Sequence, residues 1–230
     1  YKGTRAKMPD DLRPQIKRIR QMVDIFNLPR LEMEGFEADD VLGSVARVAS
    51  EEGLGVKIIT GDRDLLQLVN ERVIVNLPGR SMSDARDYSP ADVVKKLGVR
   101  PDQVVDMKAL MGDKSDNIPG VYGVGEKTAQ NLLKQYETLD NIYKHLDEIP
   151  GRFRNKLDTD KEAAYLSQEL ARIRCDLDIS VDLEHARATK LDIAAVTELF
   201  RELEMHSLIK RLNRLSPTPI FVPTADGQLS

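Results

Sequence analysis

Three short stretches of the sequence concentrate acidic side chains. They read Glu-Ala-Asp-Asp at 37–40, Thr-Gly-Asp-Arg-Asp at 60–64 and Gly-Asp-Lys-Ser-Asp-Asn at 112–117. Carboxylates that lie close together raise one another's pKa and destabilise a fold unless a cation compensates their charge. A bound cation is therefore the simplest common explanation for the seven acids Glu37, Asp39, Asp40, Asp62, Asp64, Asp113 and Asp116.

The ligand types in these stretches indicate which cation to expect. All of the candidate ligands are oxygen atoms, and no His or Cys lies beside them. Such a set selects the hard ions Mg²⁺ or Mn²⁺ and disfavours zinc. Two such ions about 4 Å apart can activate a water molecule and stabilise the leaving oxygen of a phosphoryl displacement. The pattern thus predicts a nuclease with two Mg²⁺ or Mn²⁺ ions.

A purely structural interpretation of the same acids stays open. Acidic residues favour the first turn of a helix, where they cap free N–H groups and complement the helix dipole. Asp113 and Asp116 could equally be turn residues. Each stretch alone is explained in this way, and only the combination of three stretches argues for a metal.

The elements around these acids predict a mostly parallel α/β sheet. Strands are expected at residues 30–33, 56–59 and 73–75, and helices at 38–49 and around 65–68. Strands that alternate with helices in short succession form a parallel sheet with helices on its faces. Ligands of such sheets bind at the carboxyl ends of the strands, and Asp62 and Asp64 follow one such end directly.

The remainder of the chain is expected to be helical and to end in a linker. We predict a catalytic α/β core at 1–98 and a helical region at 99–215. Residues 216–230 contain three prolines and a glycine without periodicity, which is typical of a linker to a following domain.

The charge distribution favours a polyanionic partner in spite of a net charge of −4. Residues 1–20 hold seven Lys or Arg against Asp10 and Asp11. This basic arm could attract nucleic acid, or it could be a solvated helix face. One cysteine excludes an internal disulfide framework, and no apolar run approaches the ~18 residues of a membrane span. A cytoplasmic protein without membrane contact is the expectation.

A glycine-rich stretch at 118–129 offers a site for phosphate. Gly120, Gly123 and Gly125 permit tight turns, and Lys127 and Thr128 then begin a helix. Free N–H groups at a helix start bind phosphate without reading the base sequence. The glycines could also serve only to close a turn between two helices. A dinucleotide fingerprint is disfavoured because no strand precedes the stretch.

In combination these motifs resemble the 5′-nuclease family, and most closely the 5′→3′ exonuclease domain of bacterial DNA polymerase I. The similarity extends from Tyr1 to about Leu215. It is carried by Tyr-Lys-Gly-Thr-Arg at 1–5, by Gly-Phe followed by the first acidic stretch, by the second and third acidic stretches, and by Gly-Val-Gly-Glu-Lys-Thr-Ala at 123–129.

The resemblance implies a fold and a set of roles. The fold would be a 5′-nuclease, PIN-like α/β core followed by a helix-hairpin-helix region that grips the DNA backbone, with a possible K⁺. The seven acids would form the metal cluster, with Asp39 and Asp62 acting in catalysis together with Lys2 and Arg5 at the scissile phosphate. The expected DNA contacts are Tyr1, Lys2, Arg5, Gly120, Gly123, Gly125, Lys127 and Thr128.

The resemblance also implies a substrate and a setting. Family substrates are 5′ flaps and nicked or gapped duplexes, including RNA primer ends, which are cut during DNA replication and repair. We expect a monomer that is covalently linked to polymerase domains and associated with the bacterial nucleoid.

One departure from the family pattern bears on activity. Family members carry, before the Tyr-Lys motif, further strands with another metal-binding Asp and a second acidic residue. We therefore expect the sequence to be a portion of a longer polymerase. The alternative is a catalytically incomplete DNA-binding module that uses the hairpin and the basic arm. An acidic structural domain would explain the acids but not the glycine hairpin.

Overall fold

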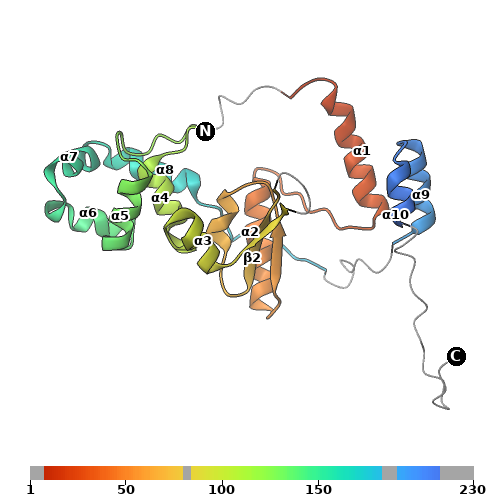
Figure 1. Ribbon diagram of the computed structural model, residues 1–230, viewed down its shortest axis with the longest axis horizontal. Helices are drawn as coiled ribbons and strands as arrows, with labels where there is room; N and C mark the ends of the chain where they lie inside the picture. Colours follow the sequence, from red (N-terminus) through yellow and green to blue (C-terminus); the bar gives the residue numbers. More distant parts are fainter. Residues whose placement is uncertain (1–7, 80–83, 183–190, 213–230) are drawn as a thin grey trace, which may run out of the picture. The chain divides into compact units, whose positions relative to one another are not determined.

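The computed structural model describes residues 8–79, 84–182 and 191–212, which form two compact units (Figure 1). The first unit comprises residues 32–180, and the second comprises residues 8–31 with the described residues beyond 180. No described helix has the length and apolar character needed to cross a bilayer. The predicted linker at 216–230 lies outside the described residues, and the predicted boundary at 98/99 stays a prediction.

A three-stranded mixed sheet lies at one end of the first unit. Its order is β1 (Val56–Ile59), β2 (Val73–Leu77) and β3 (Arg86–Tyr88). β1 pairs with β2 in parallel, which confirms the parallel pair that the sequence predicted. β3 pairs with β2 in antiparallel fashion and was not expected, because a three-residue strand carries too little pattern to be recognised.

The prediction of a strand at residues 30–33 is wrong. These residues have no regular structure, and Leu31 is 41% exposed. A strand is stabilised by pairing with a neighbour and by burial of one face, and this segment has neither among the described residues. Alternation of apolar and polar residues over four positions was too short a signal.

One face of the sheet packs against α2 (Ala38–Glu51) and the single turn of 3₁₀ helix η1 (Asp64–Leu68). β-branched residues of β1 and β2 alternate between the two faces, so that Val73 and Val75 point into the core. Leu65 and Leu66 of η1 are fully buried against them. The helix predicted around 65–68 is thus confirmed as one short turn, and it holds Asp64 at its first position.

Helices make up the rest of the first unit, and α4 is its central element. α4 packs against α5, α6, α8 and η1 and therefore joins the helices to the sheet in one hydrophobic core. In Figure 1 the helices α4 to α8 lie together on one side of the unit. Their bounds are α3 (Pro90–Leu97), η3 (Pro101–Gln103), α4 (Val104–Met111), α5 (Glu126–Tyr136), α6 (Leu139–Lys144), η4 (Leu146–Glu148), α7 (Gly151–Thr159) and α8 (Lys161–Ala171).

A buried carboxylate organises this helical part. Asp106 of α4 accepts hydrogen bonds from the backbone N–H of Leu139 at 2.9 Å and from the amide of Gln168 at 2.6 Å. Buried carboxylates are tolerated when hydrogen bonds satisfy them in this way. Asp106 thus fixes the start of α6 and the side of α8 relative to α4.

The described part of the second unit consists of three helices. They are α1 (Leu12–Ile25), α9 (Ile193–Glu202) and α10 (His206–Leu212), with a small core around Val196 and Phe200. The ring of Phe26 packs against that of Phe200 at 5.9 Å between centroids. The basic residues of α1 lie on its exposed face. This placement fits both a DNA-binding arm and a solvated helix face.

The position of Leu110 in α4 predicts a large effect of truncation. Leu110 is fully buried, whereas Leu166 of α8 is 55% exposed. Leu110→Ala should lower the free energy of unfolding by about 2–5 kcal/mol, because it leaves a cavity in the shared core. Leu166→Ala, the matched control, should change it by no more than about 0.5 kcal/mol. Urea denaturation measures both, and equal losses would contradict the central position of α4.

Candidate metal centre and hairpin

Three of the predicted ligands meet at one point of the first unit. Carboxylate oxygens of Asp64, Asp113 and Asp116 all lie within 4.8 Å of one another. Asp64 directly follows the β1 strand and its turn, whereas Asp113 and Asp116 lie in the loop after α4. Backbone hydrogen bonds in both directions between Asp113 and Ile118 close that loop. Residues that are 49 positions or more apart in the sequence are therefore brought together by the fold.

The other predicted ligands line two cavities that share Asp64. Glu37, Asp39, Asp40 and Asp64 line a cavity of about 220 Å³, and Glu169 of α8 lines it as well. Asp62, Asp64 and Asp113 line a second cavity of about 570 Å³. Glu169 was missed by sequence reasoning, because a single acid in a helix gives no signal of its own.

Several of these acids also have the structural roles that the alternative interpretation gives them. Asp40 accepts the N–H of Glu37 at 3.1 Å and the N–H of Arg174 at 2.9 Å, so it caps α2 and anchors the segment after α8. Asp62 accepts the N–H of Asp64 at 2.9 Å, and Asp113 accepts that of Ser115 at 2.8 Å. Capping and turn formation are thus real, and a metal role for Asp40 and Asp62 stays a prediction.

Lys108 of α4 lies between two of the clustered carboxylates. Its ammonium Nζ donates to Asp64 Oδ1 at 2.5 Å and to Asp113 Oδ2 at 2.8 Å, and its side chain is only 15% exposed. Sequence reasoning did not single out Lys108. The available signal was a lone cation in the otherwise apolar second half of α4, five residues before Asp113.

The electrostatics of this triad follow from burial and from the ion pairs. Burial raises the pKa of Asp64, and the hydrogen bond and charge of Lys108 offset this only in part. Burial also acts to raise the pKa of Asp113, but hydrogen bonds from Lys108 and Ser115 outweigh it and hold that pKa below its usual range. For Lys108, burial favours the neutral form, but hydrogen bonds to the two carboxylates prevail and raise its pKa.

The donor set fits a hard divalent cation. Its three members are carboxylates, and no nitrogen or sulfur ligand belongs to the group. The ammonium of Lys108 already forms ion pairs with two of the three carboxylates, so a positive charge is accommodated at this point. The acidic cluster can therefore hold a divalent metal ion.

The glycine hairpin connects α4 to α5, and its first glycine has a structural role. Gly120 has φ +65°, and its N–H donates to the buried Ser167 hydroxyl of α8 at 2.9 Å. A Cβ at Gly120 would meet the backbone N of Gly112 at 2.2 Å. The N–H of Gly120 is therefore used within the fold, and a DNA contact of Gly120 stays a prediction.

The remaining hairpin residues are arranged around the start of α5. Gly123 has φ +72°, and its carbonyl accepts a hydrogen bond from Lys156 Nζ at 3.2 Å. Gly125 immediately precedes α5, and a Cβ there would meet nothing within 4 Å. Lys127 is exposed in the first turn of α5, and Thr128 is half-buried beside it. This open helix start remains available to a phosphate group.

Tyr1, Lys2 and Arg5 lie outside the described residues. Their contacts with the scissile phosphate and the terminal base stay predictions.

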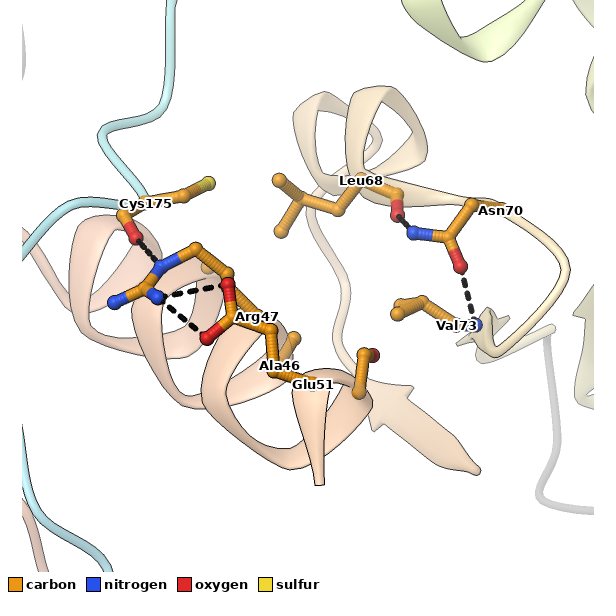
Figure 2. A pocket seen from close by; sticks show the side chains of 9 residues that line it. Ala46, Arg47, Glu51, Leu68, Asn70, Val73 and Cys175 are labelled. Atoms are coloured by element: carbon orange, nitrogen blue, oxygen red, sulfur yellow. Dashed lines mark hydrogen bonds and ion pairs between the residues drawn. The ribbon is translucent and has the colours of Figure 1, made fainter. Parts of the chain in front are cut away.

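A further cavity of about 280 Å³ lies on the opposite half of α2 (Figure 2). Arg47 donates there to the carbonyl of Cys175 at 2.6 Å and pairs with Glu51 at 2.8 Å. Burial raises the pKa of the Cys175 thiol, which disfavours the reactive thiolate. Cys175 therefore lies at a packing contact, and none of the predicted metal ligands lines this cavity.

Comparison with known proteins identifies the family. The family model described as 5′-3′ exonuclease, N-terminal resolvase-like domain, matches residues 1–98, and that of the 5′-3′ exonuclease C-terminal SAM fold matches residues 99–194. The chain belongs to the 5′→3′ exonuclease family. This membership confirms the predicted nuclease fold, with an α/β part followed by a helical part.

Relatives of this exonuclease chain include the DNA polymerase I of Caldicellulosiruptor bescii, at 45% identity over 214 residues. The DNA polymerase I of Bacillus subtilis is 40% identical over 213 residues. Each alignment covers 92% of this chain but only 25% and 24% of the respective relative. The chain thus spans about a quarter of the length of these polymerases.

Solved structures share the fold. The D15 protein of bacteriophage T5, co-crystallised with metal ions, has a TM-score of 0.63 at 21% identity, covering 89% of this chain and 76% of that one. The catalytic core of Rad2 in complex with a DNA substrate has a TM-score of 0.56 at 15% identity, covering 92% and 72%. At these identities the likeness concerns the fold alone.

The geometry of the glycine hairpin predicts that substitutions at two of its glycines change the free energy of unfolding by different amounts. Gly120→Ala should lower the free energy of unfolding by about 2–4 kcal/mol, because the new methyl group strains the backbone and collides with Gly112. Gly125→Ala should cost at most about 1 kcal/mol, because the site is open. Thermal and urea denaturation measure both variants. A Gly120→Ala protein as stable as Gly125→Ala would contradict the packing of the hairpin on α4.

Proposed function

We propose that the chain is the Mg²⁺-dependent nuclease part of a bacterial DNA polymerase I, which acts as a 5′→3′ exonuclease and flap endonuclease on DNA. The observation that carries the proposal is the convergence of Asp64, Asp113 and Asp116 on one point, with oxygen as the only ligand type. Family membership supports phosphodiester hydrolysis as the reaction of such a site.

The clustered acids would hold the metal at the carboxyl end of β1. Asp64, Asp113 and Asp116 would bind one ion, and a second would lie on the side of Asp64 that faces Glu37, Asp39 and Asp40. Divalent ions at such a site lower the pKa of water and stabilise the leaving oxygen in phosphoryl transfer. The half-buried position of Asp64 strengthens its attraction for cations, because water screens it less.

The chain's other residues would position the DNA. The exposed start of α5, with Lys127 beside it, would hold duplex phosphates. A K⁺ would be held by the helix-hairpin-helix motif that contains the glycine hairpin. Lys2 and Arg5 would contact the scissile phosphate and Tyr1 the terminal base. The proposed substrates are 5′ flaps and nicked or gapped duplexes, including RNA primer ends. The proposed setting is the bacterial cytoplasm, with polymerase domains on the same polypeptide.

Cleavage of a 5′-flap DNA tests the proposal. We expect product in Mg²⁺ and none in EDTA, and Asp116→Asn should lower the cleavage rate by more than about 100-fold, since even partners of metal ligands cost ~10–100-fold. Asp87→Asn, in an ion pair with Lys57 away from the centre, is the matched control and should cleave at the normal rate.

The outcome also separates the alternative function. Salt-dependent duplex binding that persists in EDTA, without product in Mg²⁺ or Mn²⁺, would contradict the nuclease proposal and favour a non-catalytic DNA-binding module. Unchanged cleavage by Asp116→Asn would show that the centre lies elsewhere.

The proposed phosphate contact at Lys127 predicts a sequence-independent effect. Lys127→Ala should weaken binding to all duplexes equally and reduce the slope of log affinity against log salt by about 1. Lys134→Ala, in the last turn of the same helix, is the control and should leave the slope unchanged. Fluorescence anisotropy over a salt series measures both. A change in base preference would contradict a phosphate contact.

A further inference from the structure

Lys108 occupies a position that the proposed chemistry does not use. Its ammonium bridges Asp64 and Asp113, two of the three clustered carboxylates, from the buried side of α4. Among the described residues it is the only cation in an ion pair with either of them. Arg63 and Lys114 line the neighbouring cavity but form no such pair there.

We propose that Lys108 is a positioning residue that serves as the resident cation of the metal centre. Its ammonium holds Asp64 and Asp113 close together before a divalent ion arrives, and binding of that ion displaces it. The inference rests on the proposed function, since it assumes a divalent ion at these carboxylates.

The first step of the argument is the cost of the metal-free cluster. Asp64 and Asp113 have side chains that are only 21% exposed, so their mutual repulsion is screened less than at the surface. Removing one partner of a buried charge pair leaves the other uncompensated, which is strongly destabilising. Lys108 therefore stabilises the arrangement that a metal needs.

The second step is that ammonium and metal compete for the same carboxylates. Lys108 Nζ lies 2.5 Å from Asp64 Oδ1 and 2.8 Å from Asp113 Oδ2, and both carboxylates belong to the cluster of three. A divalent ion bound to these carboxylates would lie within a few ångströms of the ammonium, and the two positive charges repel each other. This repulsion favours the departure of the ammonium when the ion binds.

The third step is that Lys108 has somewhere to move. The cavity of about 570 Å³ that Asp62, Asp64 and Asp113 line is also lined by Lys108 and by Met107 and Met111 of the same helix. A lysine carries its charge on a flexible four-carbon stem, so the ammonium can swing into this cavity without a change in the backbone. Displacement therefore requires only a change of side-chain rotamer.

The test compares the response to metal of wild type and Lys108→Met. Thermal unfolding is followed in EDTA and in saturating Mn²⁺, and Mn²⁺ affinity is measured by titration calorimetry. We expect Lys108→Met to unfold at a lower temperature than wild type in EDTA, and Mn²⁺ to raise its unfolding temperature by more than it raises that of wild type. The variant should also bind Mn²⁺ about tenfold more tightly, which corresponds to ~1.4 kcal/mol. Lys108→Arg should respond as wild type does, because it keeps the charge.

A matched control removes a lysine from a different ion pair. Lys57 pairs with Asp87 at 2.7 Å on the exposed side of the sheet. Lys57→Met should leave the Mn²⁺ response unchanged. The proposal would be overturned if Mn²⁺ raised the unfolding temperature of Lys108→Met no more than that of wild type and bound the variant no more tightly.

A second measurement serves if Lys108→Met does not fold. In ¹⁵N-lysine spectra of wild type, with Lys108 assigned through Lys108→Arg, Mg²⁺ should move the Lys108 ammonium signal toward that of a solvent-exposed lysine. A signal that saturating Mg²⁺ leaves unchanged would overturn the displacement while leaving the nuclease proposal intact. Wild-type protein that binds neither Mg²⁺ nor Mn²⁺ would overturn both.

Discussion

Compensation of negative charge at Asp64 is the constraint on which the candidate site depends. Asp64 belongs to the carboxylate cluster and lines both cavities that hold the other predicted ligands. Burial raises its pKa, and a positive charge beside the carboxylate acts against that rise. Lys108 supplies such a charge, and a divalent ion would add to it. The site is therefore an arrangement that favours cations.

The fold imposes this arrangement through a few close approaches of the backbone. β1 ends shortly before Asp64, and only Gly112 separates the end of α4 from Asp113. The backbones of Gly112 and Gly120 pack against each other, and the N–H of Gly120 donates a hydrogen bond to the hydroxyl of Ser167 in α8. The loop that carries Asp113 and Asp116 is thereby fixed between α4 and the hairpin. The same glycines thus support the acidic loop on one side and the start of α5 on the other.

Local patterns in the sequence predicted a large part of this structure. β1, β2, α2 and the start of α5 follow from β-branched runs, apolar periodicity and helix-start residues, and the parallel β1–β2 pair follows from their order. The strand at 30–33 failed because a short alternation says nothing about a pairing partner. Within the predicted helical region the bounds of α7 carry no local signal, because most of its residues are polar and only Leu157 is buried.

The site was predicted in its residue types but not in its contacts. The acidic stretches identified Asp64, Asp113 and Asp116, because clusters of acids are visible in the sequence. Lys108, Glu169 and the bond between Gly120 and Ser167 depend on helix packing across many intervening residues, and no local pattern encodes them. The most direct test is a crystal soaked in Mn²⁺ and measured for anomalous scattering. The account predicts a peak about 2.1 Å from oxygens of Asp64, Asp113 and Asp116, whereas a peak only at other surface acids, with these three carboxylates metal-free, would contradict it.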